Sequence, residues 1–129
     1  MLELVVSIVM DAAIPAHELA HAIVQEAAIA AVDPVLVAKI VMVESRGRPD
    51  AVSDTNDIGL MQINAIHGIE ERCLLDWRCN LKAGVAILAQ FRNHRPCAYN
   101  VGYRYKTRLT KCLQYEARLD KVFSGGSND

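Results

Sequence analysis

One glutamate of this sequence, Glu44, stands where it could act as an acid catalyst. It follows the apolar run 41–43, and Gly47 and Pro49 end the same helix-like stretch shortly afterwards. Because apolar neighbours disfavour the charged form of a carboxyl, its pKa should lie above the usual value of about 4.3. A glutamate that keeps its proton at neutral pH can protonate the leaving oxygen of a glycosidic bond. Taken alone, the position has a simpler interpretation, because most glutamates at helix ends are solvated.

A second pattern, His17-Glu18-Leu19-Ala20-His21, matches the zinc protease motif H-E-x-x-H. In that motif two histidines one helical turn apart bind zinc, and the glutamate activates a water molecule. Such a protease also needs a third ligand and normally a strand upstream, and only sixteen residues precede His17. We therefore keep a zinc protease as a remote alternative. We expect His17 and His21 to be surface or cap residues of a helix, with no metal and no cofactor.

Four cysteines permit two disulfides in three possible pairings. They are Cys73, Cys79, Cys97 and Cys112, and their spacing lacks the C-x2-C pairs of structural zinc sites. We therefore expect oxidised bridges rather than a metal site or four reduced thiols. Because disulfides persist in oxidising compartments, this favours a periplasmic or extracellular location.

The composition is that of one helical domain. At 129 residues the chain is long enough for one core and too short for two. Hydrophobic residues make up 52% and aromatic residues 5%, which suits packed helices better than aromatic-rich strands. No apolar run reaches the ~18 residues of a membrane span, and the first residues lack the basic charge of a convincing signal peptide. We expect a single monomeric domain over 1–129.

The net charge of −1 hides an uneven distribution, because residues 77–115 contain eight basic residues and no acidic one. The eight are Arg78, Lys82, Arg92, Arg95, Arg104, Lys106, Arg108 and Lys111. If they share one face, that face would attract an anionic polymer, either a cell-wall glycan with peptide carboxylates or a nucleic acid. A solvated helix face is the simpler interpretation. No nucleic-acid surface with interleaved aromatic residues is evident, so we expect no nucleic-acid partner.

Periodicity predicts four main helices and one long polar loop. The helices are expected over 12–31, 34–45, 79–93 and 105–123. Asp33 can cap the second helix and Pro34 can begin it, and its nearly all-apolar surface places it at the domain centre. The loop 48–58 is rich in Asp, Asn, Ser and Thr, and 59–64 returns to the core. The tail 124–129 should be mobile.

Five short blocks occur in an order that resembles one protein family. They are Glu44-Ser45, Ser53, Gly59–Asn64, Asn80–Gly84 and Ala98–Gly102. As a set they are similar to the soluble lytic transglycosylases, which share a lysozyme-like fold with goose-type lysozymes, and the resemblance covers residues 24–102. The form of 57–64 looks most like small members attached to secretion and conjugation systems, and phage enzymes with this domain are also similar. The resemblance implies a mainly α, lysozyme-like α+β fold with a small irregular β or loop region after the glutamate.

The resemblance also implies the reaction. This is cleavage, without water, of the bond between N-acetylmuramic acid and N-acetylglucosamine in peptidoglycan. Glu44 would be the only acid and base: it would protonate the leaving oxygen and then take the C6 hydroxyl proton, so that a 1,6-anhydro ring closes. One carboxylate is enough for this chemistry.

Five further residues receive roles from the resemblance. Ser53 would contact the N-acetyl group beside the cleaved bond, and Met61 and Gln62 would line the glycan groove. Tyr99 would hydrogen-bond or position the catalytic glutamate, and Asn100 would help to fix the turn that presents Tyr99. The expected partners are peptidoglycan glycan strands and, in addition, components of a secretion machine or a phage.

Two alternatives of different kinds stay open. A hydrolase resembling goose-type lysozymes, such as an endolysin, would more often need a second carboxylate, and Asp50, Asp54 and Asp57 are near enough in sequence. Goose-type lysozymes can have an aspartate at the position of Asn64, whose amide cannot serve as a base. The other alternative is a wall-docking assembly protein of a secretion system, which would use the same groove without cleavage.

Overall fold

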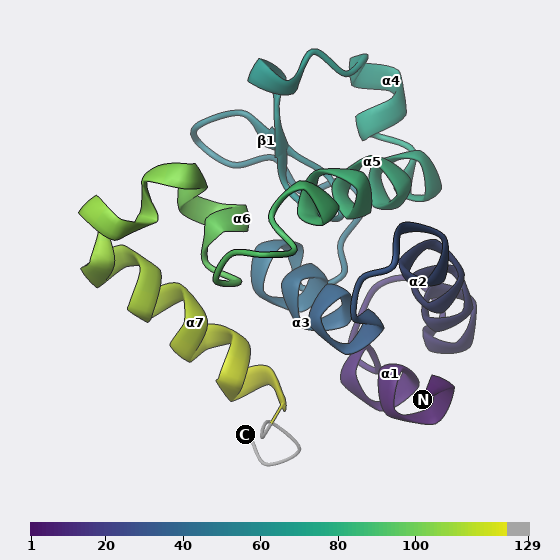
Figure 1. The fold of residues 1–129 in the computed structure, drawn as a ribbon. Coiled ribbons are helices and arrows are strands. Elements are labelled where there is room, and N and C mark those ends of the chain that lie inside the picture. Colours follow the sequence, from purple (N-terminus) through teal and green to yellow (C-terminus); the bar gives the residue numbers. More distant parts are fainter. Residues whose placement is uncertain (124–129) are drawn as a thin grey trace.

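The computed structural model describes residues 1–123, which form a mainly helical domain (Figure 1). The α-helices are α1 (Leu2–Ile8), α2 (Ala16–Ala30), α3 (Pro34–Ser45), α4 (Glu71–Leu74), α5 (Trp77–Gln90), α6 (Ala98–Val101) and α7 (Leu109–Phe123). The 3-10 helices η1 (Ala65–His67) and η2 (Gly102–Thr107) and the strands β1 (Asp57–Ile58) and β2 (Ile63–Asn64) complete the fold. The predicted mainly α fold with a small β region is confirmed. The predicted mobile tail, 124–129, lies outside the described residues.

The central element is α3, which packs against α1 and α2 on one side and α7 on the other (Figure 1). Asp33 caps it by accepting a hydrogen bond from the N–H of Val35 at 2.9 Å, and Pro34 takes the first position, where no N–H is needed. The buried residues of this helix are Val37, Ala38, Ile40, Val41 and Ser45. The predicted bounds are confirmed, and Glu44 lies in the last turn of the most central helix.

The N-terminal part differs from the prediction. The sequence pattern does not reveal α1, and α2 begins at Ala16 rather than at residue 12. Pro15 is the reason, because its ring disfavours helical geometry in the preceding residue, and its own ψ of 129° is not helical. Residues 11–14 turn instead, and the N–H of Ala13 donates to the carbonyl of Gly47 at 3.1 Å. This contact fixes the turn beside the end of α3.

The polar loop after α3 forms a small hairpin that α5 holds in place. Strands β1 and β2 pair antiparallel, with Asp57 opposite Asn64. The buried side chain of Asn80 accepts from the N–H of Met61 at 2.8 Å and donates to the carbonyls of Ile58 and Leu74 at 2.8 and 2.9 Å. One α5 side chain therefore satisfies three backbone groups that would otherwise be buried without partners.

The C-terminal helices also shift relative to prediction. Asp76 caps α5 by accepting from the N–H of Arg78 at 3.0 Å, so α5 begins at Trp77 rather than at residue 79. Residues 102–107 form the 3-10 helix η2, so α7 begins at Leu109 rather than at residue 105. Both deviations concern helix ends, and the predicted helices themselves are present.

The four cysteines form two disulfides, which selects one of the three possible pairings. Cys73 bonds to Cys79, and Cys97 bonds to Cys112. The first joins α4 to the start of α5, and the second joins the residue before α6 to α7. No helix within residues 1–123 has the length and apolar character to cross a membrane.

Candidate active site

The carboxyl of Glu44 lies in a cavity of about 460 Å³. The cavity walls come from the hairpin, η1, α5 and α6, and include Asp57, Gln62, Phe91 and Tyr99. Burial at the end of α3 is the largest cause that raises the pKa of Glu44, to about 7. A hydrogen bond and the charge of Arg118 act in the opposite direction, and the charge of Asp57 raises the pKa further. The expected raised pKa and the position at the end of a buried helix are therefore found together.

The hydrogen-bond partner of Glu44 is Tyr115 on α7. The phenol O–H donates to Oε2 of Glu44 at 2.9 Å, and the tyrosine side chain is buried. Burial, followed by the charge of Glu44, raises the pKa of Tyr115 well above its usual value, so the phenol keeps its proton and stays a donor. The guanidinium of Arg118 lies 5.3 Å from the centre of the Tyr115 ring.

Sequence reasoning missed Tyr115, although a signal was present. Cys112, Tyr115 and Leu119 follow one another at helical spacing, and all three are buried on one face of α7. A tyrosine on such a face carries a hydroxyl that needs a partner inside the protein. The polar group that meets this need is Glu44.

Tyr99 does not make the hydrogen bond that the resemblance implies. Its O–H donates to the carbonyl of Met61 at 2.8 Å, while Glu44 is bonded to Tyr115. The physical reason is position, because Tyr99 on α6 faces the turn between β1 and β2, where that carbonyl needs a donor. Tyr99 does line the cavity, and burial raises its pKa well above the usual value. Tyr99 therefore lines the cavity without a bond to Glu44, and the role of positioning Glu44 stays a prediction.

Met61 is also placed differently, because its side chain is fully buried and does not line the cavity. It packs directly over Gly84 of α5, where an added Cβ would come within 2.3 Å of its sulfur. Gln62 does line the cavity. Its amide donates to the carbonyls of Ala51 and Gly59 at 3.0 and 3.1 Å, so it also fixes the loop around the hairpin.

Asp57 is held by a dense set of hydrogen bonds beside the cavity. Ser53 and Thr55 donate to its Oδ2 at 2.9 and 2.6 Å, and Asn64 donates to its Oδ1 at 2.9 Å. Burial alone would raise the pKa of Asp57, but the bonds from Thr55, Asn64 and Ser53 lower it below the usual value. An aspartate whose pKa is lowered therefore shares the cavity with a glutamate whose pKa is raised.

The remaining predicted residues divide between the cavity and its surroundings. Asn64 and the exposed Asn100 line the cavity. Ser53 lies outside its lining, with its hydroxyl bonded to Asp57, so its contact with an N-acetyl group stays a prediction. Asp50 and Asp54 are exposed and outside the lining as well.

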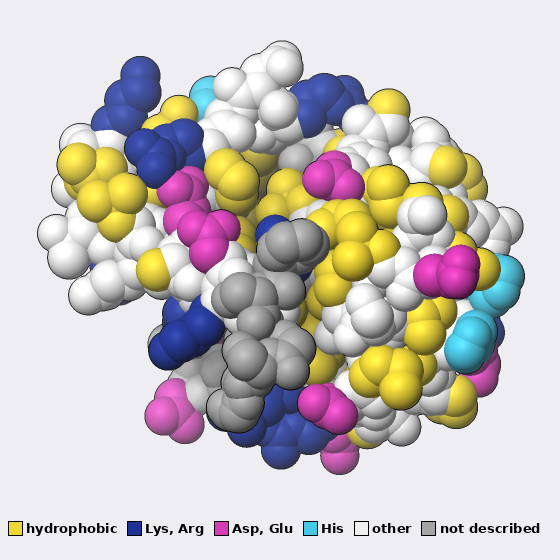
Figure 2. Space-filling view, turned by 90° about the horizontal axis from the view of Figure 1, so that it is seen from below, with side chains coloured by type: hydrophobic (Ala, Val, Ile, Leu, Met, Phe, Trp, Pro, Cys, Tyr) yellow, Lys and Arg dark blue, Asp and Glu magenta, His cyan; other side chains and the backbone are white. Residues whose placement is uncertain are grey.

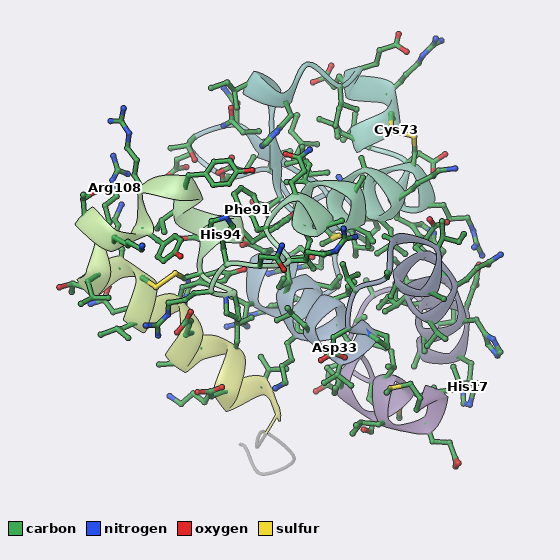
Figure 3. The ribbon with its side chains drawn as sticks, in the orientation of Figure 1. His17, Asp33, Cys73, Phe91, His94 and Arg108 are labelled. Carbon is green, nitrogen blue, oxygen red and sulfur yellow. A yellow bond between two sulfur atoms is a disulfide. The ribbon has the colours of Figure 1, made fainter. Side chains whose placement is uncertain are left out.

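The H-E-x-x-H residues lie on α2, away from this cavity. His17 and His21 are exposed, and Glu18 forms an ion pair with Arg78 at 2.9 Å. Figure 3 shows His17 at the outer edge of the molecule, whereas Phe91 lies inward near α6. Within residues 1–123 one group of three candidate ligands lies close together, Cys97, Cys112 and Glu116, and its two sulfurs form a disulfide. The described part of the chain thus adds no third ligand to the motif.

Three of the eight basic residues in the segment 77–115 bond to other groups of the protein. Arg78 pairs with Glu18, Arg95 pairs with Glu116, and the guanidinium of Arg92 donates to the carbonyl of Ala30. On the face drawn in Figure 2, Lys and Arg side chains form separate groups with Asp, Glu and apolar side chains between them. This arrangement agrees with the simpler interpretation of solvated helix faces.

The fold and the cavity together define the lysozyme-like class of helical domain. Within that class, the family described as transglycosylase SLT domain matches residues 21–111, which includes all five sequence blocks. The chain belongs to this family. Its function is therefore of the lytic transglycosylase kind, directed at peptidoglycan. No solved structure gives a significant match to the chain.

Proposed function

We propose that the protein is a peptidoglycan lytic transglycosylase that cleaves the β-1,4 bond between N-acetylmuramic acid and N-acetylglucosamine and leaves 1,6-anhydro ends. The observation that carries this proposal is the state of Glu44, a carboxyl with a pKa of about 7 in an open cavity. Such a group is half protonated near neutral pH. It can give a proton in one step and take one back in the next.

In the first step Glu44 protonates the glycosidic oxygen as the bond from that oxygen to C1 breaks. Tyr115 donates to Oε2, and we therefore assign the proton transfer to the other carboxyl oxygen, Oε1. The hydrogen bond from Tyr115 and the charge of Arg118 then favour the carboxylate that the proton transfer produces. We expect the acetamido group of the substrate to stabilise the oxocarbenium-like centre at C1.

In the second step the Glu44 carboxylate takes the proton of the C6 hydroxyl, and the C6 oxygen bonds to C1. The 1,6-anhydro ring closes, Glu44 regains its proton, and no water is consumed. Asn64 fits this scheme, because its amide donates to Asp57 and to the carbonyl of Thr55 and cannot act as a base.

Hydrolysis is the second candidate, because Asp57 lies in the same cavity and is ionised at neutral pH. An ionised carboxylate facing the substrate could activate water. However, Oδ1 accepts from Asn64, and Oδ2 accepts from both Ser53 and Thr55. These bonds lower the basicity of Asp57, and we therefore favour the transglycosylase reaction.

Mass spectrometry of digested peptidoglycan separates these reactions. A transglycosylase yields anhydro ends, which are lighter by one water than the reducing ends that a hydrolase yields. Glu44→Gln should abolish release of either product while leaving the circular dichroism spectrum unchanged. Asp54→Asn, an exposed carboxylate outside the cavity, is the matched control and should keep full activity. Full activity of Glu44→Gln would remove the proposal.

We further propose a monomer that works at the cell wall, in the periplasm or outside the cell. The two disulfides support this location, because they persist in oxidising compartments.

If the protein is instead a docking component of a secretion or phage machine, Glu44→Gln should leave its biological role intact. Complementation with Glu44→Gln in the producing organism distinguishes the two roles.

A further inference from the structure

Four rings gather where α5 ends and η2 runs beside it. The ring centres of Phe91 and Tyr103 are 4.6 Å apart, and those of His94 and Tyr103 are 5.3 Å apart. His94 also lies 5.9 Å from the ring of Tyr105, and its Nδ1 is 3.3 Å from the Tyr105 hydroxyl oxygen. Figure 3 shows Phe91 and His94 next to each other near α6.

One side of the aromatic cluster is buried in the protein, and the other side is exposed. Tyr105 is 9% exposed, whereas Tyr103 is 60% exposed although its ring packs on Phe91. The turn at Gly102 makes this arrangement possible, because its φ of 79° lies in the region that favours glycine. Apart from its chain neighbours, no atom of the described residues lies within 4 Å of a Cβ added at Gly102. The backbone conformation, and not lack of space, therefore requires the glycine.

The aromatic cluster is continuous with the catalytic cavity. Phe91, Val101 and Gly102 line the same cavity as Glu44. On the η1 side the cavity is also lined by Ile66, whose side chain is 85% exposed. Exposed apolar surface therefore continues the cavity wall on two sides, at Ile66 and at Tyr103.

The chemistry of the rings and the cavity beside them indicate which ligand the aromatic cluster binds. The chain has seven Phe, Trp and Tyr residues in all, and three of them are in this cluster, so it is not the by-product of an aromatic-rich core. A pyranose ring presents a face of C–H groups, which packs well on the negative face of an aromatic ring. A neutral sugar needs no charged partner, and the exposed Tyr103 ring offers it an apolar platform.

We propose that Phe91, His94 and Tyr103 form a stacking subsite for a sugar ring of the glycan strand, beyond the sugars that react at Glu44. This inference rests on the proposed function, because it assumes a glycan strand in the cavity. A strand long enough to reach Tyr103 binds more tightly than a short one, and the stem peptides are not needed for this gain.

The test is calorimetric titration of the Glu44→Gln protein with peptide-free peptidoglycan glycan strands of defined length, from two sugars to eight. Adding Tyr103→Ala should weaken binding of the long strands about five- to tenfold and leave the shortest strand that binds unaffected. Tyr103→Phe keeps the ring and should keep the affinity. Arg104→Ala, an exposed neighbour in η2, is the control for local damage.

The outcomes separate the two proposals. If the long strands bind and Tyr103→Ala leaves their affinity unchanged, the stacking subsite is wrong. Equal weakening at every length would also overturn it, because it would indicate a structural role for Tyr103. Failure of the proposed function is recognised differently: Glu44→Gln would still shorten the strands, or no strand of any length would bind.

Discussion

The hydroxyl of Tyr115 lies 2.9 Å from Oε2 of Glu44, although the two residues are 71 positions apart in the chain. The bond joins α7 to the end of α3, so the proton affinity of the candidate acid depends on the docking of a distant helix. Burial sets the pKa of Glu44 high, and the tyrosine bond keeps it from rising further. The pKa of about 7 is the balance of these opposed effects.

Tyr115→Phe should raise the pKa of Glu44, because it removes a hydrogen bond that favours the carboxylate and leaves the burial in place. The first step needs protonated Glu44, so the alkaline limb of the pH profile of kcat/KM should move upward by about one pH unit. Turbidity assays on purified peptidoglycan at a series of pH values measure the limb. Tyr99→Phe is the matched control: its hydroxyl bonds to the Met61 carbonyl, so the limb should stay in place.

The raised pKa of Glu44 has a consequence for stability. Below pH 4.5 the carboxyl is protonated in both the folded and the unfolded chain, and it has no effect. Between pH 4.5 and about 7 the unfolded chain releases the proton while the folded chain keeps it, so the folded state loses stability as the pH rises. Above pH 7 the full cost remains, on the order of 3 kcal/mol.

Glu44→Gln should therefore increase the free energy of unfolding at pH 8 by about 3 kcal/mol and change it little at pH 4. Glutamine can still accept the hydrogen bond from Tyr115, so the gain reports on the removed charge. Urea denaturation at the two pH values measures it, with Asp54→Asn as an exposed control. A gain of the same size at pH 4 would show that packing, and not titration, is responsible.

Asp57→Asn should move the alkaline limb in the opposite direction from Tyr115→Phe. The negative charge of Asp57 raises the pKa of Glu44, so its removal lowers that pKa and shifts the limb to lower pH. Activity should also fall, by about tenfold, because Ser53 and Thr55 lose a charged acceptor. The products should keep their anhydro ends. Loss of all product with a normal fold would instead support Asp57 as the water-activating base of a hydrolase.

The sequence predicts the parts of the site whose signals are local. Asp33 and Pro34 mark the start of α3, and the apolar run 41–43 predicts a buried position for Glu44. The polar stretch that becomes the hairpin is also recognisable from its composition. Each of these depends on neighbours within a few residues, so no knowledge of the tertiary fold is needed.

The sequence does not predict the parts that depend on how helices cross. The docking of α7 on α3 brings Tyr115 to Glu44, and the approach of α5 to the hairpin buries Met61 over Gly84. Tyr99 illustrates the same limit, because its presence in the cavity follows from the family blocks but its partner does not. The packing of the helices decides which side chains meet across elements. The spacing of residues in the sequence does not reveal these pairs.

The bond between Cys97 and Cys112 should matter more for activity than the bond between Cys73 and Cys79. It joins the start of α6, which carries Tyr99, to α7, which carries Tyr115, so both tyrosines depend on it for position. The other bond closes a short segment around α4, outside the cavity lining. The two bonds span 15 and 6 residues, and loop entropy predicts stabilisation of about 3 and about 2 kcal/mol respectively.

Replacing both cysteines of each pair by serine tests this difference. The Cys97→Ser and Cys112→Ser protein should lose most of its activity at 25 °C while circular dichroism still shows a helical fold, because α6 can then shift relative to α7. The Cys73→Ser and Cys79→Ser protein should be less stable by urea denaturation but nearly fully active. The two-serine proteins are matched in chemistry, so equal activities would show that the α6–α7 bond contributes to stability alone. In that case the position of Tyr115 beside Glu44 must be maintained by the packing of α7 on α3.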